Sequence, residues 1–140
     1  MKTKFLTLAL IVLVNGHVFS QQNTLVVVVK NVKEAKGRIA IALFNSEKDF
    51  TTKAMQGKTT VAKAGEVQIT FENITSGDYA ISVMHDANEN DELDSNAIGI
   101  PKEGFGFSND AMGMFGPPSF EKAKFNLSGD IKVTIALKYL

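Results

Sequence analysis

Regular alternation of apolar and polar residues is the feature that most constrains the fold of this chain. In residues 66–74 (EVQITFENI), Val67, Ile69 and Phe71 alternate with polar residues. Successive side chains of a β-strand point to opposite faces, so this pattern predicts a strand with one buried face. Further apolar or alternating segments, separated by polar turns, occupy residues 24–32, 37–45, 78–85, 122–127 and 131–139.

Six or seven short strands and one brief helix predict an all-β fold. We expect an antiparallel β-sandwich of about seven strands, prealbumin-like or immunoglobulin-like, with a long ordered loop over residues 85–120. The helix is expected over residues 46–55, where Ser46 can cap its first turn. Phe50 and Ala54 are four residues apart and would pin that helix to the sheet.

The first twenty residues have the pattern of a secretory signal peptide. Lys2 and Lys4 precede an apolar run at residues 5–14, and a small-residue cleavage site ends before Gln21. The run is shorter than the roughly 20 residues that a transmembrane helix needs. We therefore expect one domain over residues 21–140, exported to the periplasm or outside a bacterial cell, that does not span the membrane after cleavage.

Composition excludes several classes of function. Loss of residues 1–20 would leave a net charge of −2 without a basic block, which argues against a nucleic-acid partner. The chain has no cysteine, so disulfides, thiolate catalysis and thiolate metal sites are excluded. His85 would be the only histidine of the mature chain, which excludes a zinc site built from several histidines.

An acidic turn opens the long loop. In HDANENDELD, oxygen-bearing side chains recur at every second position, as in calcium loops that use positions 1, 3, 5, 7 and 9. The spacing predicts a calcium site; Glu92, at position 7, would ligate through its backbone carbonyl, and the side-chain ligands are Asp86, Asn88, Asn90 and Asp94.

Two departures separate this turn from an EF-hand. Position 6 is Asp91 instead of glycine, and position 12 is Ala97 instead of glutamate; no helices are expected on either side. The alternative is that Asp and Asn are present because their side chains favour turns. Five carboxylates within nine residues would repel one another without a counterion, which favours calcium.

An enzymatic alternative centres on His85. In this hypothesis a hydrolase or isomerase would use His85 with Glu103 and Ser108, brought together by the loop. Neighbouring strand residues point to opposite faces, so Asp86 is badly placed to orient His85. No serine lies in a GxSxG turn. The commoner role of such a histidine is a structural one at the rim, bonded to loop backbone.

Glycine and aromatic residues dominate the second half of the loop. The segments GFGF and MGMFGPP present Phe105, Phe107, Met114 and Phe115 on a glycine-rich backbone. Exposed, these side chains would form a surface for a ligand; folded back, they would cover the open end of the sandwich. Both arrangements can hold in one molecule.

The long loop also carries a family resemblance. The pattern HDxNxNxxLDxNxxGxPxEGxGFSN, followed by FGPPSFxxA, resembles the bacterial domain-of-unknown-function 2141 family, and the likeness extends over nearly the whole mature chain. The resemblance implies a small exported protein and assigns no activity. Asp91 stands where that family more often has glycine.

A second likeness concerns FENITSGDYAISV. It is similar to a step in transthyretin-like and carboxypeptidase-regulatory sandwiches, in which a turn delivers a Tyr-bearing strand into the core. That likeness implies a prealbumin-like sandwich and no function. Together these observations favour a non-enzymatic binding or structural module of the cell envelope. Its 85–120 loop would bind a glycan, a peptide or a protein.

Overall fold

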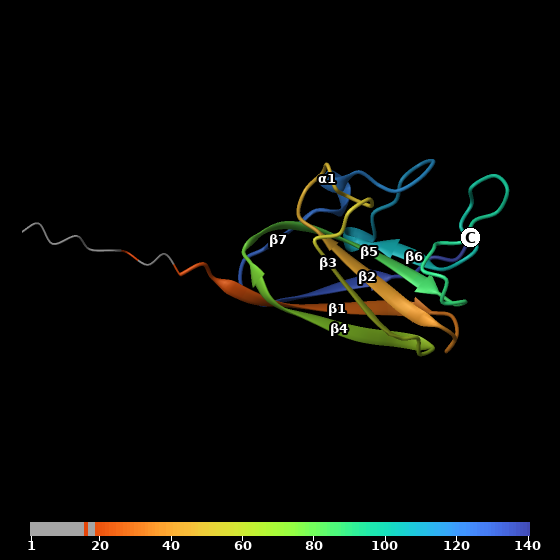
Figure 1. Cartoon of the computed structure of the whole chain (residues 1–140), viewed down its shortest axis with the longest axis horizontal. Helices are drawn as coiled ribbons and strands as arrows, with labels where there is room; N and C mark the ends of the chain where they lie inside the picture. Colours follow the sequence, from red (N-terminus) through yellow and green to blue (C-terminus); the bar gives the residue numbers. More distant parts are fainter. Residues whose placement is uncertain (1–15, 17–18) are drawn as a thin grey trace, which may run out of the picture.

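The structure is a computed structural model that describes Gly16 and residues 19–140. Most of the expected signal peptide lies outside these described residues. The described chain is mostly β-structure arranged in two sheets that lie one over the other (Figure 1). Among the described residues, no helix has the length and apolar character needed to cross a bilayer.

The first sheet has the strand order β4-β1-β8. Its strands are β1 (Gln22–Val32), β4 (Gly65–Thr75) and β8 (Ile131–Ala136). β1 pairs antiparallel with β4 and parallel with β8, which corrects the expectation of a wholly antiparallel arrangement.

The second sheet has the strand order β3-β2-β5-β6 and is antiparallel; β7 pairs with the first residues of β5. Its strands are β2 (Arg38–Phe44), β3 (Gln56–Val61), β5 (Gly77–Asp86), β6 (Phe105–Phe107) and β7 (Phe125–Leu127).

The main core lies between the two sheets. Its members are the alternating apolar residues of facing strands, which are almost wholly removed from solvent, and removal of such area from water is the main stabilising contribution. Central members are Leu25, Val27, Val29, Ile39, Ile41, Leu43, Phe71, Ile81 and Val83. The alternation in residues 66–74 therefore placed the inward face of β4 correctly, with Val67 and Phe71 in this core.

The prediction of a helix over residues 46–55 is wrong. This segment forms turns, because Thr51 adopts a left-handed backbone conformation (φ 63°) that ends any helical run. Ser46 still accepts a hydrogen bond from the Asp49 N–H, as a cap would. The α-helix of the described chain is instead α1 (Phe120–Ala123), where the sequence predicted part of a strand.

A second apolar cluster covers one end of the second sheet on its outer side. Phe50 is its centre, with edge-to-face contacts to Phe44 at 5.3 Å and to Phe120 at 5.7 Å between ring centroids. Phe44 and Ala80 are a cross-strand pair on the outer face, so this cluster covers that end of the face. Phe50 thus pins its segment to the sheet as expected, but without a helix and without Ala54, which is exposed.

Candidate functional site

The outer face of the second sheet has a floor of small side chains. Ala40 and Ala42 of β2 face outward, because Ile39, Ile41 and Leu43 between them fill the core. In the strand register Ala42 lies opposite Ser82 and Gly57, and Ala40 lies opposite Met84 and Thr59. Small side chains leave this part of the face hollow.

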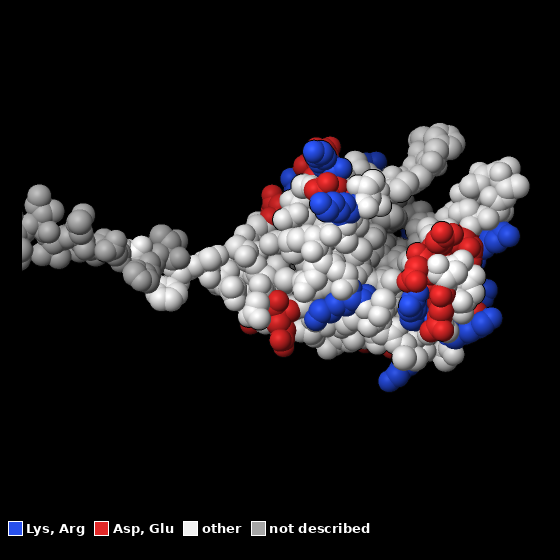
Figure 2. Space-filling view, in the orientation of Figure 1, with Lys and Arg blue, Asp and Glu red and all other residues white. Residues whose placement is uncertain are grey.

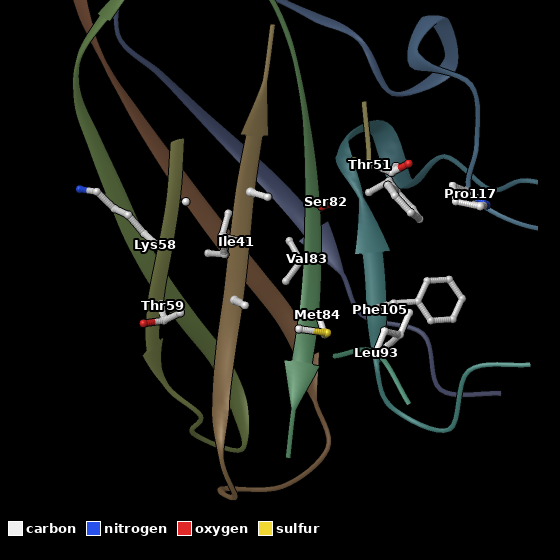
Figure 3. Close-up of a pocket in the computed structure, with 14 residues that line it drawn as sticks. Ile41, Thr51, Lys58, Thr59, Ser82, Val83, Met84, Leu93, Phe105 and Pro117 are labelled. Carbon is white, nitrogen blue, oxygen red and sulfur yellow. The ribbon is translucent and has the colours of Figure 1, made fainter. Parts of the chain in front are cut away.

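Aromatic and apolar residues build the walls of this hollow. Phe105 lies opposite Met84 and Phe107 opposite Ser82, so both rings rise at one side of the floor. Leu93 closes one end, and Thr51 and Pro117 close the other (Figure 3). We call this site the outer groove; it is open to solvent and has a volume of about 600 Å³. Figure 2 shows a largely uncharged face between an acidic patch and the charged side chains around α1.

The acidic turn at the Leu93 end is held by Asp86. This carboxylate is 0% exposed and accepts hydrogen bonds from Arg38 Nε at 3.1 Å and Nη2 at 2.9 Å. It also accepts the backbone N–H groups of Asn90 at 3.1 Å and Asp91 at 3.0 Å. Arg38 and Asp86 are a cross-strand pair, so the turn is fixed directly to the sheet.

Asp91 explains one departure from the calcium-loop pattern. Its backbone is left-handed (φ 66°), the conformation that glycine usually supplies at this position. Asp tolerates that conformation better than most residues, and its carboxylate also pairs with Arg38. The turn therefore keeps its shape without glycine.

Burial and hydrogen bonding act on the Asp86 carboxylate in opposite directions. Burial raises its pKa, whereas hydrogen bonds from the Asp91 N–H and from Arg38 lower it. The Asn90 N–H acts in the same direction, and the pKa lies below the ordinary 3.8. Asp86 is therefore a charged anchor at neutral pH.

Glu103 fastens both ends of the same turn. Its Oε1 accepts the Ala87 N–H at 3.0 Å, and its Oε2 accepts the Asp94 N–H at 3.1 Å. Glu103 thereby holds the start and the end of the acidic turn together, two residues before β6 begins at Phe105. The carboxylate that the enzymatic alternative needs thus has a structural task.

The predicted calcium ligands form one exposed cluster and one buried anchor. The side-chain amides of Asn88 and Asn90 both donate to the Asp94 carboxylate, at 2.6 and 3.0 Å. Asp86 points instead to Arg38 and the turn amides. Within the described residues, no group of three or more His, Cys, Asp or Glu side chains is placed to hold a metal ion.

His85 is buried in a closed hydrogen-bond network. Its Nε2 lies 2.7 Å from the Lys36 carbonyl, which can only accept, so Nε2 carries the proton. Its Nδ1 then accepts from the Tyr139 hydroxyl at 2.8 Å, and that oxygen accepts the Lys33 N–H at 3.0 Å. His85 therefore ties a turn and the C-terminal segment to β5. The adjacent cavity, also lined by Glu103, holds only about 90 Å³.

Ser108 lies in a different part of the fold from this network. Its buried hydroxyl donates to the Ala123 carbonyl at 2.5 Å and accepts the Ile81 N–H at 2.9 Å. The hydrogen bonds of the described residues join neither Ser108 nor Glu103 to His85. His85 and Glu103 line the same small cavity, but Ser108 lies elsewhere, so the structure does not bring the three residues of the enzymatic alternative together.

The predicted ligand surface divides into two parts. Phe105 and Phe107 line the outer groove, although Phe107 is only 8% exposed and packs on Phe50, while Met114 and Phe115 are 90% and 99% exposed at the end of the 111–118 loop. Sequence reasoning missed the floor, although Ala40 and Ala42 lie in the alternating segment of residues 37–45. Nothing in the pattern indicated that this face is left uncovered.

We expect Asp86→Asn to weaken the fold by about 1–3 kcal/mol at neutral pH, because Arg38 and two amides lose a charged acceptor. The lowered pKa means that the Asp86 contribution is fully present above pH 3.8 and is lost as pH falls through the lower folded-state value. Urea unfolding at pH values between about 2 and 6 measures this loss.

The control for this variant is Glu72→Gln, which removes an exposed carboxylate of β4. The acid-dependent loss of stability should be smaller in Asp86→Asn than in the wild type and unchanged in Glu72→Gln. Equal pH dependence of the wild type and Asp86→Asn would refute the anchoring role.

Comparison with known proteins adds the family. No curated protein and no solved structure matches the chain. A family model matches residues 27–135, a span that runs from within β1 into β8 and includes the whole 85–120 loop. The chain therefore belongs to the family described as uncharacterized protein conserved in bacteria (DUF2141), as the motif resemblance indicated.

Proposed function

We propose that this protein is a non-enzymatic binding module of the bacterial cell envelope whose outer groove takes an apolar segment of a partner peptide or protein. The observation that carries the proposal is the groove itself. About 600 Å³ of space lies over a small-residue floor beside two phenylalanine rings, within the range of ligand sites in proteins.

The chemistry of the lining favours an apolar occupant over a glycan. The polar residues that line the groove are Thr51, Thr59, Ser82 and Lys58. The Lys58 side chain belongs to the inward face of β3 and donates to the Thr70 carbonyl at 2.5 Å, so its ammonium group points away from the groove (Figure 3). A glycan would bury many hydroxyl groups here with few partners, which costs free energy.

The roles of the polar residues support a non-enzymatic function. Both ring nitrogens of His85 are occupied, and Ser108 is enclosed by backbone groups. Glu103 holds two amides of the acidic turn. These groups stabilise the loop that builds the groove wall.

Export of the protein is part of the same proposal. Lys2, Lys4 and the apolar run at residues 5–14 support a cleaved signal peptide and a periplasmic or extracellular location. Mass spectrometry of the protein recovered from the bacterial envelope should give an N-terminus at Gln21. Recovery of the uncleaved chain from the cytoplasm would contradict export.

We also infer that the two sheets form a prealbumin-like sandwich. Tyr79 supports this assignment, because it begins the core-facing residues of β5 and its hydroxyl donates to the Thr75 carbonyl at 2.6 Å. Superposition of an experimental structure on prealbumin-like and immunoglobulin-like sandwiches tests the assignment; a better fit to the second class would reject it.

Binding of the apolar dye 1-anilinonaphthalene-8-sulfonate tests the groove. We expect dye fluorescence to rise with dilute wild-type protein and to be lost in Ala42→Trp, whose indole would fill the floor. The control is Thr134→Trp, an exposed position of β8 in the other sheet. Equal dye binding by wild type and Ala42→Trp, with both folded, would reject the groove as a binding site.

Calcium at the acidic turn is a second proposal. It is supported by the closeness of Asn88 and Asn90 to the Asp94 carboxylate and by the exposed carboxylates beside them. The two amide nitrogens face Asp94, so in this proposal both amides turn to present their oxygens to the ion. Ca²⁺ prefers such oxygen ligands. In this proposal Asp86 holds the turn in shape through Arg38, and the ion stiffens the Leu93 end of the groove.

Isothermal titration with calcium chloride tests the ion directly. We expect weak binding, with a Kd on the order of 10⁻⁴–10⁻³ M as in extracellular calcium modules. The heat should disappear in Asp94→Asn and persist in Glu72→Gln. No heat from the wild type, or unchanged heat from Asp94→Asn, would exclude calcium at this turn.

A further inference from the structure

The 111–118 loop carries two large apolar side chains into solvent. Met114 and Phe115, at 90% and 99% exposed, lie between Gly113 and Gly116 on a loop that projects beyond the sheets (Figure 1). We call residues 113–116 the apolar tip. Single exposed apolar residues are common, but two adjacent ones at a loop apex need an explanation.

The tip is held in a defined shape. A Cβ atom on Gly113 would overlap the carbonyl oxygens of Gly116 and Pro117, so only glycine permits this close turn. The loop is fixed at its base because Pro118 and Phe120 are buried. Such a preorganised tip loses little conformational entropy on binding.

The same chain also carries an apolar site that its own tip does not fill. Pro117 lines the outer groove, whereas Phe115, two residues before it, does not. Tip and groove are therefore close in the chain, and both are open to a second molecule. A surface with adjacent complementary parts can meet its own copy across a two-fold axis, each copy giving one tip and one groove.

We propose that the apolar tip of one copy packs into the outer groove of a second copy, forming a reciprocal two-fold dimer. This inference rests on the proposed function of the groove as a binding surface. It names an occupant that covers the groove when no other partner is bound.

The area of such a contact suits a dimer. An aromatic side chain buries about 150–250 Å² on packing, so a Met–Phe tip and the walls that receive it bury about 600–800 Å² together. Two reciprocal contacts then bury about 1,200–1,600 Å², which lies in the range of specific interfaces. A single contact would fall below that range, so reciprocity matters.

Charge favours a protein surface over a lipid surface for this side of the molecule. The acidic turn at the other end of the groove exposes Glu89, Asp91 and Glu92, and an anionic bilayer would repel them. The Thr51 end carries Lys48 and Lys53 with Glu47 and Asp49, a mixture that repels neither sign. A second copy that approaches in antiparallel fashion would face this mixed end with its acidic turn.

Disulfide cross-linking tests the contact cleanly, because the chain has no cysteine. Chains with Met114→Cys are mixed with chains carrying Thr59→Cys, which lies on the groove floor, and are oxidised with glutathione disulfide. We expect the mixed disulfide between positions 114 and 59, identified by mass spectrometry. In the control, Leu140→Cys, also an exposed apolar position (71%), replaces Met114→Cys. Equal yields from the two mixtures would overturn the proposal.

Sedimentation equilibrium gives the second measurement. Phe115→Ser should weaken dimerisation at least about tenfold, as loss of a central aromatic contact does, and Leu140→Ser should leave it unchanged. At high protein concentration Phe115→Ser should bind more dye than the wild type, because its groove is free. If the wild type is monomeric but binds dye, the dimer proposal is rejected and the proposal of the groove as a binding site is not. Absence of dye binding in both proteins would overturn the groove itself.

Discussion

The buried carboxylate of Asp86 is the interaction on which the rest of the site depends. It stands at the end of β5, pairs with Arg38 of β2 and accepts two amides of the acidic turn. Because Glu103 fastens the end of that turn, the chain is delivered to β6 in a fixed register. Phe105 then lies opposite Met84 and becomes a wall.

The outer face of the second sheet can be followed from one end to the other. The Phe50 cluster covers the Phe44 end, and the acidic turn covers the end at Arg38. The small residues between these two covers are left open, and they form the floor of the outer groove. The 85–120 loop therefore forms the outer groove chiefly because it leaves the middle of this sheet face uncovered.

Alternation predicted the core strands well and the remaining elements poorly. β3 (Gln56–Val61) was missed because its inward position is Lys58, and β6 because three residues are too few for a period. The ion pair between Arg38 and Asp86 joins residues 48 positions apart, so the sequence of the acidic turn alone does not predict it. The floor escaped notice because a strand pattern identifies two faces without telling whether the second is covered.

The most direct test of the central claim is chemical-shift mapping of the ¹⁵N-labelled protein titrated with 1-anilinonaphthalene-8-sulfonate. If the outer groove is the binding surface, the perturbed amides should cluster at Ala42, Ser82, Met84 and Phe105, with little change on the outer face of the first sheet. Perturbations concentrated on the first sheet, or spread evenly over the molecule, would contradict the account.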